Sequence, residues 1–206
     1  MAVSEEFITL YSPTKRVKLT SPIPELDESI AALRCAPTTL RYLKFFPETF
    51  STEEARARRE SRAKETNLID LYVFALGDDG EYELAGSTGV FNVDNLFKCC
   101  EGGILVAPKF VGKGLTAEIF YTLFQYMFDE KGFHRMSFET SMENEPMRGW
   151  FEKAAGIRLE GVKKEWWTDK QGGWTDVASY ALLEREWRED VKGRMEKRMS
   201  AKSGRS

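Results

Sequence analysis

Histidine and cysteine are scarce in this chain of 206 residues. There is one histidine, His134, and the three cysteines include no Cys-x-x-Cys pair. Structural zinc sites are built from several such ligands, so we expect no metal site. Cys35, Cys99 and Cys100 are an odd set with two adjacent members, which argues against a disulfide framework. A reducing compartment fits both observations.

The chain also lacks long apolar runs and a strong charge of either sign. No stretch approaches the roughly 18 apolar residues that a membrane-spanning helix needs, and the first residues have neither the basic start nor the apolar core of a secretory signal. The formal net charge of −3 gives no general attraction to nucleic acid or to an anionic membrane. We therefore expect a cytoplasmic protein with no nucleic-acid or membrane partner.

Apolar residues make up 42% of the sequence, which is enough for one substantial core. A chain of this length falls short of the size at which a second domain becomes the default. We expect one domain over residues 1–187. Residues 188–206 are polar and mostly basic, and they predict a helix that fades into a disordered tail.

Hydrophobic periodicity predicts a mixed order of strands and helices. Two turn-rich stretches, Gly77-Asp78-Asp79-Gly80 and residues 169–173, separate β-rich runs and predict two antiparallel hairpins. Gly102-Gly103 inside a strand predicts a bulge or a close backbone approach. The predicted strands cover residues 16–19, 70–76, 82–92, 100–106, 134–140, 158–167 and 174–183, and the predicted helices cover residues 26–34, 38–43, 51–65, 114–130 and 145–155.

The helix predicted over residues 51–65 begins with the pattern of a capping box. The Ser51 side chain would accept from the backbone while Glu54 reaches back to it. The helix is rich in arginine, and the simplest interpretation of these arginines is a solvated face.

A glycine-rich loop between an apolar run and an amphipathic helix is the most informative stretch. Gly112 and Gly114 let successive backbone N–H groups turn toward one anion, with the positive end of the next helix behind them. The stretch predicts a phosphate-binding loop. It is not a nucleotide-triphosphatase loop, because Gly114 follows Gly112-Lys113 where that loop needs a hydroxyl to ligate magnesium.

A dinucleotide-binding loop is an alternative for the same residues. Gly112 to Ala117 satisfies Gly-x-Gly-x-x-Gly/Ala, and Glu139 ends a later predicted strand. Two features speak against it. Pro108 to Val111 separate the strand from the first glycine, and an antiparallel hairpin follows where further βα crossovers are needed.

A wider pattern resembles the GNAT superfamily of N-acyltransferases. Its parts are a strand, Lys109-x-x-Gly112-x-Gly114, a long helix, a strand, Asn144, a short helix and a terminal hairpin. The family's pyrophosphate loop reads Arg/Gln-x-x-Gly-x-Gly/Ala, and Lys109 keeps the positive charge. The resemblance implies an α/β fold of the α+β type: a mixed, mostly antiparallel sheet with a splayed parallel strand pair and helices on both faces.

Within that superfamily the chain is most similar to the Rim-type branch, which acetylates ribosomal-protein N-termini and includes small-molecule acetyltransferases. The similarity runs from about Arg16 to Trp187. It rests on an ordered set of phrases: Leu84-Ala85-Gly86-Ser87-Thr88-Gly89, Glu101-Gly102-Gly103-Ile104-Leu105-Val106-Ala107-Pro108, Gly112-Lys113-Gly114-Leu115-Thr116-Ala117-Glu118, Gly132-Phe133-His134-Arg135, and Gly173-Trp174-Thr175-Asp176-Val177-Ala178-Ser179-Tyr180.

The resemblance implies acetyl-CoA as co-substrate, bound between two splayed parallel strands. Free backbone groups would bind the pantetheine arm, the loop N–H groups would bind the pyrophosphate, and Asn144 would bond the pantetheine region or simply cap its helix. The residues implied for acetyl-CoA are Ile104, Leu105, Val106, Lys109, Val111, Gly112, Lys113, Gly114, Leu115 and Asn144.

Acyl transfer from a thioester needs an uncharged amine. Neutralising a lysine-like amine at pH 7 costs about 4.6 kcal/mol, and an α-amine about 1 kcal/mol. Glu101 matches the family's strand glutamate and is our candidate for the base, with a surface ion pair as the plainer alternative. For Glu118, Glu139 and His134 we favour structural roles, and Cys99 and Cys100 are interpreted as buried strand residues.

The chain departs from the family where the leaving thiolate would be protonated. Met147 and Phe151 stand where relatives carry a serine or a tyrosine.

The prediction is an N-acetyltransferase that acts by direct transfer to a small-molecule amine or a protein N-terminus, as a monomer or homodimer. A non-catalytic acyl-CoA-binding module is the alternative, and a dinucleotide-binding oxidoreductase is less favoured. Trp166, Trp167 and Trp174 on the terminal hairpin either line the acceptor site or only close the core.

Overall fold

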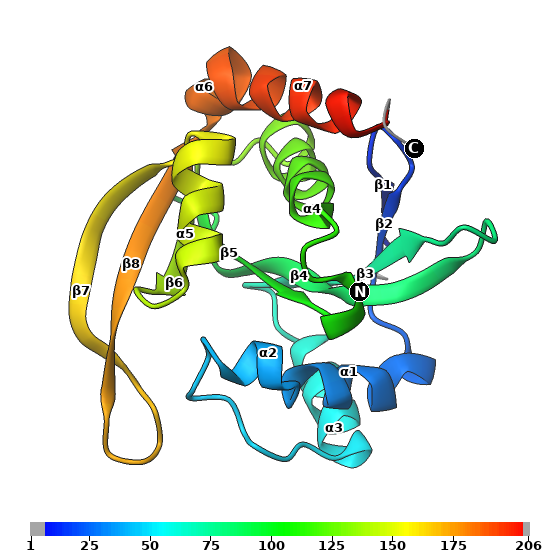
Figure 1. The fold of residues 1–206 in the computed structure, drawn as a ribbon, viewed down its shortest axis with the longest axis vertical. Helices are drawn as coiled ribbons and strands as arrows, with labels where there is room; N and C mark the ends of the chain where they lie inside the picture. Colours follow the sequence, from blue (N-terminus) through cyan, green and yellow to red (C-terminus); the bar gives the residue numbers. More distant parts are fainter. Residues whose placement is uncertain (1–6, 204–206) are drawn as a thin grey trace.

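One eight-stranded sheet organises the molecule, which a computed structural model describes over residues 7–203 (Figure 1). Its strand order is β1-β2-β3-β4-β5-β6-β8-β7, and every neighbouring pair is antiparallel except β5 and β6. The strands are β1 Thr9–Tyr11, β2 Val17–Thr20, β3 Ile69–Leu76, β4 Tyr82–Asp94, β5 Cys99–Val106, β6 Arg135–Ser141, β7 Arg158–Thr168 and β8 Trp174–Leu183.

Helices cover both faces of the sheet, as predicted (Figure 1). Helices α1 to α3 lie on one face, and α4 and the C-terminal helices lie on the other. The helices are α1 Asp27–Arg34, α2 Pro37–Leu40, α3 Thr52–Arg62, α4 Leu115–Phe124, α5 Glu145–Gly149, α6 Glu184–Glu186 and α7 Lys192–Ser203. Tighter 3-10 turns are Pro24–Leu26 and Pro108–Phe110, and wider π-helical turns are Gln125–Glu130, Trp150–Ala155 and Trp187–Val191.

Most predicted elements are present with small shifts of their ends. Both hairpins form, and the capping box exists, with the Ser51 Oγ accepting from the Glu54 N–H at 3.1 Å and the Glu54 carboxylate accepting from the Ser51 N–H at 2.7 Å. Strand β1 was not predicted, since three residues are too few to show a period.

Gly102-Gly103 forms neither the predicted bulge nor the predicted close backbone approach, because a side chain and not a backbone lies against Gly102. A Cβ added to Gly102 would lie 2.7 Å from a ring carbon of Phe138. The irregular pairing instead lies on the partner strand, between Phe91 and Asp94, where Asn92 has a φ of 52°. Glycine at 102 therefore makes room for the Phe138 ring.

The main core lies between the sheet and α4, and it is unusually aromatic. Phe120, Phe124, Phe138 and Phe151 are all buried and their rings contact one another at centroid distances from 5.1 to 5.9 Å. A smaller cluster of Ile30, Leu33 and Tyr72 packs on the opposite face. Two cores therefore hold the sheet rigid on both sides.

The parallel pair is short. Strands β5 and β6 pair only at Cys99–Arg135, Cys100–Met136 and Glu101–Ser137. Beyond this point β6 stays paired with β8 as far as Ser141, while β5 stays paired with β4 as far as Val106. The two strands thus diverge after Glu101, which is the predicted splayed pair.

The C-terminal helix α7 packs on the domain. Met195 is 1% exposed and belongs to the main core, and the Tyr121 hydroxyl donates to Glu196 at 2.6 Å. Trp187, just before α7, is fully buried and its Nε1 donates to Asp129 at 3.1 Å. The helix expected after residue 187 is therefore in contact with α4, and residues 204–206 of the expected disordered tail lie outside the described residues.

If α7 is an integral part of the fold, Met195→Ala should lower the free energy of unfolding by about 2–5 kcal/mol, because it leaves a cavity in the main core. Lys197→Ala, on the exposed side of the same helix, should change it by less than about 0.5 kcal/mol. Urea unfolding followed by circular dichroism measures both. Equal stabilities of the two variants would show that α7 contributes no core packing.

Candidate active site

The divergence of β5 and β6 exposes one row of backbone groups. The Ala107 N–H donates to the Ala85 carbonyl at 2.8 Å, so this residue bonds to β4. Bonding direction alternates along an antiparallel strand. The backbone groups of Ile104 and Val106 therefore face the gap, whereas those of Leu105 face β4, and a Cβ on Gly86 would lie 2.1 Å from the Leu105 carbonyl oxygen.

The glycine loop follows the 3-10 turn Pro108–Phe110 and ends at the first residue of α4. Gly112 and Gly114 have φ values of 79° and 75°, in the left-handed region that favours glycine. Gly114 is the N-cap of α4 and supplies no side-chain cap, so the first N–H groups of α4 have no side-chain acceptor there. The Val111 and Lys113 N–H groups donate within the loop, to Pro108 and Phe110.

The two lysines of the loop lie at its surface. The Lys109 Nζ donates to Glu83 at 2.5 Å, and it is the more exposed partner of that pair. The Lys113 Nζ lies 5.1 Å from the ring centroid of Phe110. Both lysines place a positive charge beside the loop backbone, and the charge of Lys109 is paired with Glu83.

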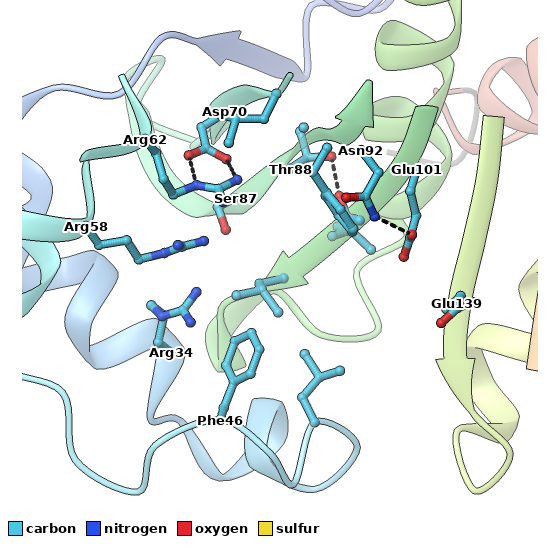
Figure 2. A pocket seen from close by; sticks show the side chains of 18 of the residues that line it. Arg34, Phe46, Arg58, Arg62, Asp70, Ser87, Thr88, Asn92, Glu101 and Glu139 are labelled. Atoms are coloured by element: carbon cyan, nitrogen blue, oxygen red, sulfur yellow. Dashed lines mark hydrogen bonds and ion pairs between the residues drawn. The ribbon is translucent and has the colours of Figure 1, made fainter. Parts of the chain in front are cut away.

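A cavity of about 490 Å³ begins where the two strands part, and Glu101 lies on its wall (Figure 2). Its floor is formed by β4 and β5, from Ser87 to Asn92 and from Glu101 to Leu105. The Asn92 amide donates to the Glu101 Oε2 at 3.1 Å, so the irregular residue of β4 orients this carboxylate. The cavity extends from the gap toward α1 and α3.

The pKa of Glu101 is raised above its ordinary value. Burial is the main cause, and the nearby carboxylate of Glu139 adds to it. The hydrogen bond from Asn92 and the charge of Lys163 act in the opposite direction but are smaller. A carboxylate with a raised pKa is a better proton acceptor than an ordinary glutamate.

Glu139, for which a structural role was favoured, faces Glu101 across the cavity (Figure 2). It is held by an ion pair with Lys163 of β7 and accepts a longer hydrogen bond, 3.4 Å, from the Ser179 hydroxyl. The ion pair fits a structural role. The charge of Glu139 also raises the pKa of Glu101, an effect that spacing along the sequence does not reveal.

One of the three hairpin tryptophans lines the cavity. Trp167 contacts the ring of Phe45 edge-on at 5.0 Å between centroids, and Phe46 lines the cavity beside it. Trp166 and Trp174 are 55% and 63% exposed. The wall opposite the sheet is thus formed by Trp167 and by the loop after α2.

The solvated face expected for the arginines of α3 is wrong for three of them. Arg58 and Arg62 line the cavity, and Arg59 forms a bidentate pair with Asp27 at 2.8 and 2.9 Å. Only the exposed Arg56 matches the expectation. The signal was available, since these positions lie three to seven residues after the buried Ala55 and so share its helical face.

The far end of β6 leads into α5, where Asn144 acts as N-cap. Its Oδ1 accepts from the Met147 N–H at 3.2 Å, and its amide donates to the Thr140 hydroxyl at 3.0 Å. Met147 packs at the edge of the core, and Phe151 is 2% exposed with its ring stacked on Tyr180 at 4.8 Å. Neither side chain offers a proton.

The remaining candidates lie away from the cavity. Glu118 is buried and accepts from the Thr14 hydroxyl at 2.8 Å, with Arg16 3.7 Å away, so it ties α4 to the turn before β2. His134 is exposed at the start of β6. Burial raises the pKa of the Cys100 thiol to about 12, which leaves it unreactive.

No group of three or more His, Cys, Asp or Glu side chains within residues 7–203 is placed to hold a metal ion. No helix in the same range has the length and hydropathy to cross a membrane.

Solved structures that are named as acetyltransferases share this fold. A putative acetyltransferase from T. thermophilus superposes with a TM-score of 0.76 and 25% identity, covering 94% of this chain and 98% of that one. The spermidine N-acetyltransferase from Vibrio cholerae, solved with CoA and spermine, gives a TM-score of 0.75 at 18% identity, over 84% of this chain and 98% of that one. At 18% identity, the likeness to the Vibrio cholerae enzyme shows the fold alone.

Sequence comparison agrees with the fold. The Bacillus subtilis (strain 168) protein named "Putative ribosomal N-acetyltransferase YdaF" is 30% identical over 104 residues, which are 50% of this chain and 56% of that protein. The match thus spans little more than half the length of this relative. Residues 16–156 match the acetyltransferase (GNAT) domain. The chain therefore belongs to the GNAT acetyltransferase family, which confirms the family and enzyme class that its motifs predict.

Proposed function

We propose that this protein transfers the acetyl group of acetyl-CoA to a primary amine by direct attack, with Glu101 as the general base. The observation that carries the proposal is the end of the β5–β6 ladder at Glu101 and Ser137. Three features meet at that position: a gap with free backbone groups, the Glu101 carboxylate oriented by Asn92, and the start of the cavity.

The gap and the loop fit acetyl-CoA. Ile104 and Val106 would bond the pantetheine arm as an added strand, while Leu105 lines the cavity beside it. The N–H groups of Gly112, Gly114 and Leu115, behind which the helix dipole of α4 lies, would hold the pyrophosphate. Lys109, Val111 and Lys113 would support the loop by charge and by its internal bonds, and Asn144 would orient the arm while capping α5.

Acetyl-CoA supplies the thioester carbonyl that the amine attacks. The amine nitrogen forms the new C–N bond, the C–S bond breaks, and CoA leaves as a thiolate. Glu101 would accept the proton that the amine gives up, directly or through a water molecule. Its raised pKa suits this role, because burial and Glu139 oppose its negative charge.

The acceptor is proposed only as a primary amine, either on a small molecule or at a protein N-terminus. The Bacillus subtilis relative is named for ribosomal acetylation, and the Vibrio cholerae enzyme for spermidine, so the named relatives differ in acceptor. A non-catalytic acyl-CoA-binding module remains the second candidate, because Met147 and Phe151 leave no proton donor at the usual places. Release of free CoA in an amine screen separates the two.

Glu101→Gln should lower kcat by about 100-fold or more, because the amide keeps the bond from Asn92 but cannot accept a proton. The loss should be larger for an acceptor amine of high pKa than for an α-amine, since more must be neutralised. Steady-state kinetics with both amine types measures this. Glu81→Gln, on the exposed β3–β4 turn, is the control, and unchanged kcat in Glu101→Gln would remove Glu101 from the base role.

Gly112→Ala should weaken acetyl-CoA binding about tenfold, because alanine in the left-handed region costs about 1–2 kcal/mol and the free loop would relax away from the cradle. Gly132→Ala is the matched control. Gly132 has a φ of 67°, and like Gly112 it has open space around an added Cβ, but it lies before β6. Calorimetric titration with acetyl-CoA should show weaker binding only in Gly112→Ala; equal affinities would contradict the cradle.

A further inference from the structure

Three arginines converge on the end of the cavity that lies away from the strand gap. Arg34 comes from α1, and Arg58 and Arg62 come from α3, one helical turn apart (Figure 2). Arg62 has a bidentate partner in Asp70, at 2.5 and 2.7 Å. Within residues 7–203 no carboxylate lies at ion-pair distance from Arg34 or Arg58, although ion pairs of the neighbouring Arg59 and Arg62 are present.

Arg34 is held in place without any hydrogen bond to its Nε. That atom is buried and has no partner among the described residues. The guanidinium instead lies over two rings, 4.2 Å from the centroid of Phe46 and 5.2 Å from that of Phe50. The aromatic contacts fix the guanidinium beside the cavity and leave its donors unused.

Positive charge predominates at this end of the cavity, where three arginines lie with the two carboxylates of Glu65 and Asp70. Burial lowers the pKa of Arg34 to about 10, and the charges of Arg58 and Arg62 contribute to that lowering. The pKa of Arg58 is also lowered, first by burial and then by Arg62. Both side chains stay protonated at neutral pH, so their mutual repulsion would be relieved by a bound anion.

The opposite end of the cavity is acidic, with Glu101 and Glu139 (Figure 2). The sheet register separates the two ends, because Asp70 pairs with Gly89 and Gly89 pairs with Gly103. Two strand spacings of about 5 Å and two residues of about 3.4 Å put the backbones of Asp70 and Glu101 about 12 Å apart. A ligand that touches both ends must therefore carry its charged groups several bonds apart.

We propose that the acceptor is a small molecule with a carboxylate or phosphate group, which binds to Arg34 and Arg58 while its amine lies at Glu101. This inference rests on the proposed function, since the proposed catalytic base defines where the amine lies. The cavity of about 490 Å³ is of the size that binds small ligands. A polyamine acceptor fits poorly, because it would place a further positive charge beside two guanidiniums that form no ion pair within the described residues.

The test is a titration of the CoA-loaded protein with aminohexanoate and with aminohexanamide, in which a neutral amide replaces the carboxylate and the amine is unchanged. We expect the acid to bind about tenfold tighter or more, since charge-assisted hydrogen bonds are the stronger kind. Arg58→Gln should abolish that difference and change the affinity for the amide by less than about twofold. Arg56→Gln, on the exposed face of the same helix, should leave both affinities unchanged.

Aminopentyl phosphate and diaminohexane complete the set. Tighter binding of the phosphate than of the carboxylate, or the reverse, identifies the anion and supports the proposal in either case. Equal affinity for the acid and the amide, tighter binding of the diamine, or an anion preference that survives Arg58→Gln would overturn it.

Failure of the proposed function has a different signature. In that case no amine is acetylated from acetyl-CoA, whereas the anion-dependent binding and its loss in Arg58→Gln persist. If the acid and the amide are acetylated with equal kcat/KM and bind equally, the proposed function is supported and the anion site is contradicted.

Discussion

The end of the β5–β6 ladder is the constraint on which the site depends. Three residue pairs hold the strands together, and then each strand follows its other neighbour, β4 or β8. Because each strand stays paired on its outer side, the divergence leaves backbone groups free on the inner side only. Gly102 takes part in this, since its missing side chain leaves space for the buried ring of Phe138 just past the last pair. The same aromatic core that stabilises the domain thus fixes the place where the strands part.

Glu101 gains its properties from being the last paired residue. The strand pairing fixes its backbone, and the irregular Asn92 of the neighbouring strand fixes its carboxylate. Burial and Glu139 raise its pKa, while the charge of Lys163, which is paired with Glu139, lowers it by a smaller amount. The proposed proton acceptor therefore comes from β5, the amide that orients it from β4, and the like charge that raises its pKa from β6. Only the sheet brings these three strands together.

The sequence was sufficient for the fold and for the loop at which we propose that acetyl-CoA binds. The motif around Gly112 and Gly114, and its position between a strand and a long helix, are local signals, and local signals can be interpreted without coordinates. The charged residues that line the rest of the cavity were not predicted to meet, because they are distant in sequence. Arg34, Arg58 and Glu139 belong to three different elements, and each has an ordinary surface explanation when considered alone. The helical spacing from Ala55 was the one clue that α3 turns its arginines inward.

Two protonation free energies show how much the absence of a hydroxyl group at Met147 and Phe151 matters. A thiolate with a pKa near 8.5 is protonated at pH 7 with a gain of about 2 kcal/mol, and water can supply that proton after the C–S bond has broken. Neutralising a lysine-like amine costs about 4.6 kcal/mol before the reaction begins. The larger barrier thus lies on the amine side, where Glu101 is in place, and not on the thiolate side, where Phe151 is buried in the core. The substitution at Phe151 therefore weighs less against catalysis than a loss of Glu101 would.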